Sequence, residues 1–298
     1  MKIRLAFGLS AALLLAGAVH AQQAGQDQPT GDLVPPTSAS DFTAGQLDAV
    51  LAGSWRSAAN KARDVYRHPK ATLQFFGLQP DQTVIEITPG AGWYSEVLAP
   101  LLRDNGHYIA AVTDNNAEAK QDVAALRAKF AADPTEYAKT SIATFNPQAP
   151  VFGPAGSADM VLTFRNVHNW AMAGTAQAMF KAFYAVLKPG GVLGVVDHRA
   201  APGATLDSVK GSGYLPTDYI IKLATDAGFK LDGQSEVNAN PKDTKDYPKG
   251  VWTLPPTLTL GDQDRAKYLA IGESDRMTLR FVKAGKASPA SSSSAAAH

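Results

Sequence analysis

Two short polar segments carry the side chains best suited to acid–base chemistry. The segment 165–170 contains Asn166 and His168, and Asp197 and His198 adjoin each other further along the chain. Each segment follows an apolar run of strand length, so two of the six histidines fall at predicted strand ends. An imidazole titrates near neutral pH and can act as a general base, while a nearby carboxylate can orient it. We therefore predict that His168, Asp197 and His198 form a catalytic cluster.

The same side chains have two other interpretations. Two histidines and an aspartate can ligate a divalent metal ion, which would make the cluster the centre of a metal-assisted enzyme. In a structural interpretation, His168 caps a helix and Asp197 pairs with Arg199. Trp170 then packs in the core, whereas in a functional site it would stack on a ligand. Ligand spacing cannot be judged across separate strands, so these alternatives stay open and we assign no metal ligands.

A glycine-rich turn is the most specific local pattern in the chain. Residues 86–94 read Glu-Ile-Thr-Pro-Gly-Ala-Gly-Trp-Tyr and continue the apolar run 84–87. Glycine permits backbone conformations and close ligand approach that a Cβ forbids, and the amides of a following helix face the crevice at the strand ends. A pyrophosphate-binding turn would need a third glycine at G-x-G-x-x-G spacing, and Glu86 would repel phosphate there. The turn indicates a ligand that presents an amino group.

Strand-like and helix-like patterns alternate around these residues. The predicted strands are 84–87, 108–112, 160–164, 192–196, 229–237 and 277–282. The predicted helices are 45–53, 55–66, 70–76, 94–102, 118–131, 175–187 and 216–227. This alternation predicts a parallel sheet with helices on both faces. The last strand alternates apolar and polar residues, so we expect it to be a half-exposed antiparallel edge strand.

The first 21 residues have the pattern of a secretory signal peptide. Lys2 and Arg4 precede the apolar run 5–18, and the following residues 19–21 end in Ala21, a small residue of the kind signal peptidase prefers. The run is about 14 residues long, too short to span a bilayer comfortably. An uncleaved anchor is the alternative. We expect a periplasmic or secreted protein without stable membrane insertion after cleavage.

The rest of the chain divides by composition into three parts. Residues 22–40 are rich in Gln, Gly, Pro, Ser and Thr and predict a flexible leader, and residues 284–298 predict a disordered tail. The folded part is then 41–283. Its long Pro-containing segment 238–273 carries Trp252, and long irregular insertions of this kind are often lids. We expect 238–273 to cover the strand ends.

The overall composition excludes several classes of protein. Hydrophobic residues make up 45% and charged residues 18% of the chain, as in ordinary globular proteins. Lys and Arg number 28 against 27 for Asp and Glu, which argues against a nucleic-acid partner. The chain has 0 cysteines, so disulfides, thiolate metal sites and cysteine nucleophiles are excluded. A small molecule is the expected partner, and the oligomeric state is not predicted.

Three segments in order resemble the class I S-adenosylmethionine (SAM)-dependent methyltransferases. Residues 86–92 resemble motif I, an acidic residue followed by G-x-G-x-G, with Thr88 in place of the first glycine. Residues 158–162 resemble the fourth-strand motif, and Leu-Lys-Pro-Gly-Gly at 187–191 resembles the turn before the fifth strand. The turn 86–94, together with Asn-Pro-Lys-Asp at 240–243 and Val-Trp-Thr-Leu-Pro-Pro at 251–256, resembles a group of exported bacterial predicted methyltransferases. The resemblance implies a three-layer Rossmann-like methyltransferase fold, an α/β fold with a mostly parallel seven-stranded sheet and an antiparallel last strand.

The resemblance also implies SAM as the cofactor. Glu86 would orient the methionine amino group, and Asp114 is the nearest candidate for the acidic residue that bonds the ribose hydroxyls. Asp114 lies a residue or two later than usual. The implied cofactor-binding residues are Glu86, Thr88, Pro89, Gly90, Gly92, Trp93, Tyr94, Asp114 and Asn166.

Three functions follow as hypotheses. The first is a SAM-dependent methyltransferase that acts on an unidentified small molecule. The second is an exported ligand-binding protein that keeps the fold without catalysis, which the departure at Thr88 favours. The third is a metal-assisted enzyme that uses His168, Asp197 and His198. Fold alone does not decide between them, and export would separate the protein from the cytosol, where SAM is made.

Overall fold

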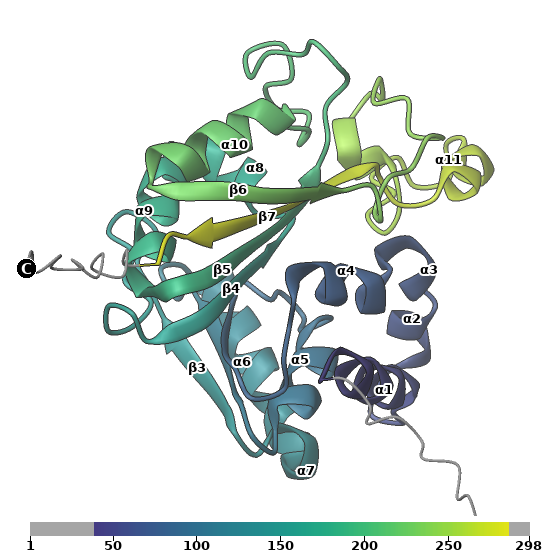
Figure 1. Cartoon of the computed structure of the whole chain (residues 1–298). Coiled ribbons are helices and arrows are strands. Elements are labelled where there is room, and N and C mark those ends of the chain that lie inside the picture. The colour runs from purple at the N-terminus through teal and green to yellow at the C-terminus, as the bar shows by residue number, and fades with distance from the viewer. Residues whose placement is uncertain (1–38, 286–298) are drawn as a thin grey trace, which may run out of the picture. The chain divides into compact units, whose positions relative to one another are not determined.

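The computed structural model of the chain describes residues 39–285 (Figure 1). The predicted signal peptide and nearly all of the predicted leader and tail lie outside these residues. Among the described residues, no helix combines the length and the apolar character needed to cross a bilayer. The predicted limits of the folded part, 41–283, stay a prediction.

A seven-stranded sheet with the order β3-β2-β1-β4-β5-β7-β6 forms the centre of the described structure. The strands are β1 (Thr83–Ile87), β2 (His107–Val112), β3 (Thr140–Thr144), β4 (Ala158–Phe164), β5 (Leu187–His198), β6 (Phe229–Ser235) and β7 (Arg276–Lys283). The first five strands pair in parallel, whereas β7 pairs antiparallel with both β5 and β6. The predicted mostly parallel sheet with an antiparallel last strand is confirmed.

The position of β7 corrects the prediction of an edge strand. β7 lies between β5 and β6, and residues 276–279 are buried. The alternation of polar and apolar residues suggested an exposed face, but the polar side chains are buried on partners. Thr278 accepts a hydrogen bond of 2.9 Å from Asn238, and Arg276 pairs with Glu273. The edge strands are β6 and β3, and β3 was missed because Thr-Ser-Ile-Ala-Thr is largely polar.

Helices on both faces complete three layers (Figure 1). They are α1 (Ala39–Ala52), α2 (Ala58–Lys61), α3 (Asp64–Arg67), α4 (Pro69–Phe76), α5 (Ser95–Leu102), α6 (Ala117–Ala132), α7 (Pro134–Tyr137), α8 (Val167–Met172), α9 (Ala176–Val186), α10 (Thr217–Asp226) and α11 (Arg265–Ile271), with a 3-10 turn at Gly250–Thr253. Successive strand residues face opposite sides of a sheet. Val84 accordingly packs in one core cluster with α1, α4, α5 and α6. Ile85 and Ile87 pack in the other cluster with α8, α9 and α10.

The segment before α4 is more broken than predicted. The expected helix over 55–66 is two short helices, α2 and α3, and Ser57 caps α2 by accepting the Asn60 N–H at 3.1 Å. Arg63 precedes α3 and Arg67 ends it. Residues four apart in a helix share one face, so both arginines are presented on the same side. The interruption between α2 and α3 thus places Arg63 and Arg67 where they line the cavity described below.

Candidate active site

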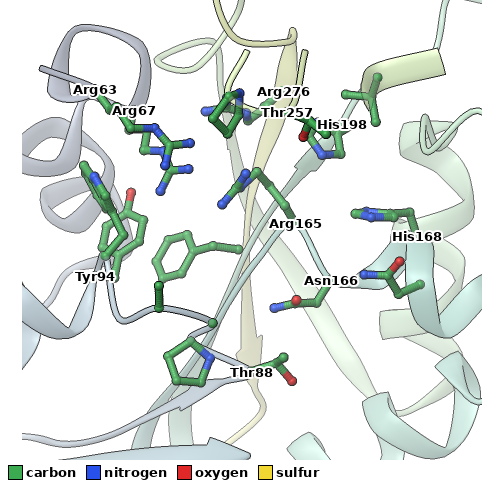
Figure 2. Close-up of a pocket in the computed structure, with 18 of the residues that line it drawn as sticks. Arg63, Arg67, Thr88, Tyr94, Arg165, Asn166, His168, His198, Thr257 and Arg276 are labelled. Carbon is green, nitrogen blue, oxygen red and sulfur yellow. The ribbon is translucent and has the colours of Figure 1, made fainter. Parts of the chain in front are cut away.

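A cavity of about 400 Å³ opens at the carboxyl ends of β1, β4 and β5 (Figure 2). The strand order reverses between β1 and β4, and ligands of open α/β sheets bind at such a switch point. The wall of the cavity comprises residues of the turn 86–94, the segment 164–169, Asn60, Arg63, Arg67, His198, Arg276 and residues of the segment 251–257. Trp252 and its neighbours from the predicted insertion 238–273 therefore contribute to this wall.

The turn after β1 has a left-handed backbone at three alternate residues. The φ angles of Thr88, Gly90 and Gly92 are 52°, 59° and 77°. A β-branched residue rarely adopts such an angle, and the cost is about 1–3 kcal/mol. The Thr88 N–H donates to the carbonyl of Ala111 at 2.8 Å, which holds this conformation. Thr88 thus keeps the backbone shape that a glycine would take without strain.

The turn leaves open space in front of Gly90. A Cβ on Gly90 would meet no atom within 4 Å, whereas one on Gly92 would lie 3.0 Å from the Leu126 side chain. Gly90 and Pro89 line the cavity, and Gly92 does not. Gly92 is therefore required for packing against α6, and Gly90 for access to the cavity.

Glu86, next to the last residue of β1, forms part of the cavity wall. Its carboxylate is buried and accepts hydrogen bonds from Tyr108 at 2.5 Å and from Ser95 at 3.5 Å. Burial raises the pKa of Glu86 to about 7, and the hydrogen bonds only partly oppose this rise. Near neutral pH, Glu86 therefore exchanges between its charged and neutral forms.

Trp93 and Tyr94 connect the turn to its surroundings as well as lining the cavity. The indole N–H of Trp93 donates to the Asn60 carbonyl at 3.0 Å. The guanidinium of Arg67 lies over the same ring, 4.6 Å from its centroid. Tyr94 stacks on Phe164 with ring centroids 3.6 Å apart. These contacts fix the turn relative to α3 and β4.

The structure brings His168, Asp197 and His198 together. Nδ1 of His168 donates to the wholly buried carboxylate of Asp197 at 2.9 Å, and the two imidazole rings are 5.1 Å apart. Nδ1 of His198 forms a hydrogen bond of 2.6 Å with Ser274 Oγ. Both histidines line the cavity, while Asp197 lies behind them. Asp197 does not pair with Arg199, which binds Asp275 and Glu236 instead.

Electrostatics keep His198 neutral. Burial lowers the pKa of His198 well below its usual value, and the charges of His168 and Arg276 lower it further. The ring nitrogen of neutral His198 that Ser274 does not occupy accepts a hydrogen bond if Nδ1 carries the proton, and donates one if Ser274 donates to Nδ1.

The carboxylate of Asp197 is already occupied by hydrogen bonds. The candidate ligand atoms of His168, Asp197 and His198 all lie within 4.8 Å of one another, close enough for a metal ion. However, Asp197 also accepts the N–H groups of Val167 at 2.7 Å and of His198 at 2.8 Å, one on each oxygen. The three hydrogen bonds are those of an Asp–His pair, and a metal bound through Nδ1 of His168 would have to displace the bond between His168 and Asp197.

Of the other residues predicted for the site, Asn166 lines the cavity, whereas Asp114 and Trp170 do not. Asn166 lines the cavity and donates to the Ile87 carbonyl at 2.9 Å, which joins the ends of β1 and β4. Asp114 is exposed two residues beyond β2, and it is not among the residues that line this cavity. Trp170 is buried in the core against Phe183, as the structural interpretation expected.

Sequence reasoning missed four arginines of the cavity wall. They are Arg63, Arg67, Arg165 and Arg276. The spacing of Arg63 and Arg67 on one helical face was a usable signal, and Arg165 directly precedes the predicted Asn166. Arg276 directly precedes the predicted strand 277–282, and nothing in the sequence placed it beside the other three.

Comparisons with known proteins establish the fold. No family model and no curated protein sequence matches the chain. A SAM-dependent methyltransferase from Aquifex aeolicus superposes with a TM-score of 0.51 at 14% identity, over 80% of this chain and 98% of that one. The [4+2]-cyclase SpnF superposes with a TM-score of 0.52 at 15% identity, over 83% and 97% of the two chains. The chain therefore has the Rossmann-like fold of class I SAM-dependent methyltransferases, a fold that also occurs in a cyclase.

Proposed function

We propose that the protein is a SAM-dependent methyltransferase that acts on a small molecule. The observation that carries the proposal is that two features open onto one cavity of about 400 Å³: the left-handed turn after β1 and the Asp197–His168 pair. Pockets for small organic ligands have volumes of about 300–1,000 Å³. The cavity is thus large enough for a substrate next to part of a cofactor.

The residues of the turn suit SAM. The open space at Gly90 allows a ligand to approach the backbone, and Glu86 can accept a hydrogen bond from the methionine ammonium group. A cationic ammonium next to Glu86 would favour the charged carboxylate and offset its raised pKa. Asp114 stays the candidate for binding the ribose hydroxyls. Because it does not line the cavity, the ribose would have to extend beyond the cavity to reach it.

SAM would supply the methyl group. His168 would take the proton of the acceptor hydroxyl or amine at Nε2, because its Nδ1–H is donated to Asp197. Asp197 keeps the ring oriented. A positioned general base typically accelerates such a step by about 10²- to 10⁴-fold. His198, neutral and next to His168, would orient the acceptor.

Calorimetric titration with SAM and with S-adenosylhomocysteine tests the proposal. We expect both to bind with micromolar dissociation constants, and Gly90→Val to abolish binding because its side chain would fill the open space at the turn. Gly203→Val is the matched control, since Gly203 also has a positive φ and open space but lies outside the cavity wall. Absence of binding at millimolar ligand would overturn the proposal.

A further inference from the structure

Four guanidinium groups gather on one side of the cavity. Arg63 and Arg67 come from the α3 region, Arg165 follows β4, and Arg276 begins β7. We refer to these four residues as the arginine wall. Figure 2 shows them on the side of the cavity away from Thr88, with the ends of Arg67 and Arg165 directed toward each other. Segments that are far apart in the sequence thus place their positive charges together at this side of the cavity.

The wall has fewer negative partners than positive charges. Glu273 receives Arg63 Nε at 2.6 Å, Arg67 Nε at 3.3 Å and Arg276 Nη2. Burial raises the pKa of Glu273, but the charges of Arg276, Arg67 and Arg63 outweigh it and hold this pKa at about 2. The ionised carboxylate of Glu273 is therefore shared by three of the four arginines of the wall.

Arg165 is the least satisfied member of the wall. Its side chain forms no hydrogen bond or ion pair with any residue in the described range 39–285. Burial and then the charge of Arg276 lower the pKa of Arg165 to about 10, and the charges of Glu273 and Asp197 only partly oppose this fall. Its backbone has a φ of 64°, held by a hydrogen bond of 2.7 Å from its N–H to the Val196 carbonyl. The strained backbone at Arg165 thus places a cation without an ion-pair partner in the cavity wall.

Further donors of the wall have no partner. Arg63 Nη2, Arg67 Nη2 and Arg276 Nε are buried atoms without a hydrogen-bond acceptor. Burial and then the charge of Arg165 lower the pKa of Arg67 to about 8. Buried unpaired donors are rare because each one is costly, and clustered like charges add repulsion. An anion with several oxygens on the wall would reduce the repulsion between the guanidinium groups, and the buried donors would gain acceptors if these side chains turned toward it.

From this excess of cations and free donors, we propose that the arginine wall binds the phosphate group of a small phosphorylated ligand. Arginine forms paired N–H···O bonds to phosphate oxygens, and a phosphate monoester carries nearly two charges on three oxygens near neutral pH. A single carboxylate brings one charge and two oxygens, which would leave most of the excess charge unpaired. The identification of this ligand as the methyl acceptor rests on the proposed function, but the phosphate site itself does not.

The place of the wall fits this ligand. The charges of Arg276, Arg165 and Arg67 all act on His198, so the wall adjoins the histidine pair. A phosphate on the wall would therefore place the organic part of a small molecule beside His168 and His198. Glu86 lies in the same cavity, but its raised pKa of about 7 reduces its repulsion of an anion.

Titration of the protein with inorganic phosphate and with glycerol 3-phosphate tests the proposal at low ionic strength. We expect both phosphates to bind with dissociation constants below about 1 mM. Succinate, a dicarboxylate without phosphate, should bind at least about tenfold more weakly. Vesicles that contain phosphatidic acid test a lipid source and should not bind more tightly than glycerol 3-phosphate. Equal affinity for phosphate and succinate, or tighter binding to the vesicles, would overturn the proposal. So would the absence of phosphate binding at about 10 mM, ten times the weakest dissociation constant expected.

Arg165→Gln is the decisive variant because its side chain has no protein partner to lose. We expect it to weaken phosphate binding at least about tenfold and to leave the melting temperature without phosphate unchanged or higher. Arg127→Gln, an exposed residue of α6, makes the same charge change away from the cavity and should bind phosphate normally. Equal affinity of the two variants would contradict the proposal.

SAM in the same titrations separates this proposal from the proposed function. Phosphate should bind the SAM-saturated protein as well as it binds the free protein. If SAM displaces phosphate, the wall holds the SAM carboxylate and the proposal is wrong. If phosphate binds and SAM does not, the proposed function fails and the phosphate site stands.

Discussion

Asp197 accepts a hydrogen bond of 2.9 Å from Nδ1 of His168, and both side chains are buried. The backbone N–H groups of Val167 and His198 donate to the same carboxylate. Asp197 is therefore fixed by three donors from the ends of two neighbouring strands. The ring of His168 is oriented before any ligand enters the cavity, which is the arrangement that a general base requires.

Asp197→Asn tests this arrangement. Asparagine has one acceptor oxygen, and its amide NH₂ would face at least one of the three donors. We expect the free energy of unfolding to fall by about 2–4 kcal/mol, because buried donors are left unpaired. Denaturant unfolding measures the loss, with Asp122→Asn on the exposed face of α6 as the control. Equal stability of the two variants would show that the carboxylate is not needed.

The candidate site was predictable where one local pattern determines it. The glycine turn is contiguous in sequence, and His168 and Asp197 each follow an apolar strand, so their meeting at one sheet edge follows from parallel pairing. The arginine wall was not predictable, since it depends on how the broken segment around Arg63 and the start of β7 pack together. Only the folded chain shows that Glu273 is shared.

Glu86→Gln should change the pH dependence of stability. The pKa of Glu86 rises from an ordinary 4.5 to about 7 in the folded protein, so its stabilising contribution is fully present below 4.5 and is lost as the pH rises through 7. Glutamine cannot ionise, so the variant should gain stability relative to the parent between these pH values. The gain above pH 7 should reach about 3 kcal/mol. Urea unfolding from pH 4.5 to 8 measures it, and a gain that does not vary with pH would refute the role of burial.

Thr88→Gly should preserve the turn. The φ of 52° at Thr88 is strained for threonine and free for glycine. We expect a melting temperature equal to or above that of the parent, because released strain of about 1–3 kcal/mol offsets the added chain entropy. SAM affinity should stay equal or increase. A marked loss of SAM affinity would mean that the Thr88 side chain itself contacts the cofactor.

Glu273→Gln should leave the arginine wall without its counter-ion. Removal of one partner from a buried ion pair costs about 3–5 kcal/mol, so the melting temperature should fall. Added phosphate should restore part of this loss by pairing with the arginines. Glu236→Gln removes an exposed partner of Arg199 and should cost less than about 1 kcal/mol. A similar small loss in both variants would indicate that the wall does not depend on Glu273.

The fold shows the same division between local pattern and long-range packing. Alternation of strands and helices predicted the parallel sheet, since β1, β2, β4 and β5 are apolar runs. It misplaced β7 because alternation alone cannot distinguish an exposed Thr278 from one buried on Asn238. Polarity likewise concealed β3, whose position at the sheet edge tolerates its threonines.

A crystal structure of the protein with S-adenosylhomocysteine tests the central claim most directly. We predict that the ligand lies over residues 88–92, with its amino group toward Glu86 and its sulfur facing the part of the cavity that His168 lines. A ligand that binds elsewhere, or a turn left unoccupied at saturating concentration, would contradict the proposed methyltransferase site.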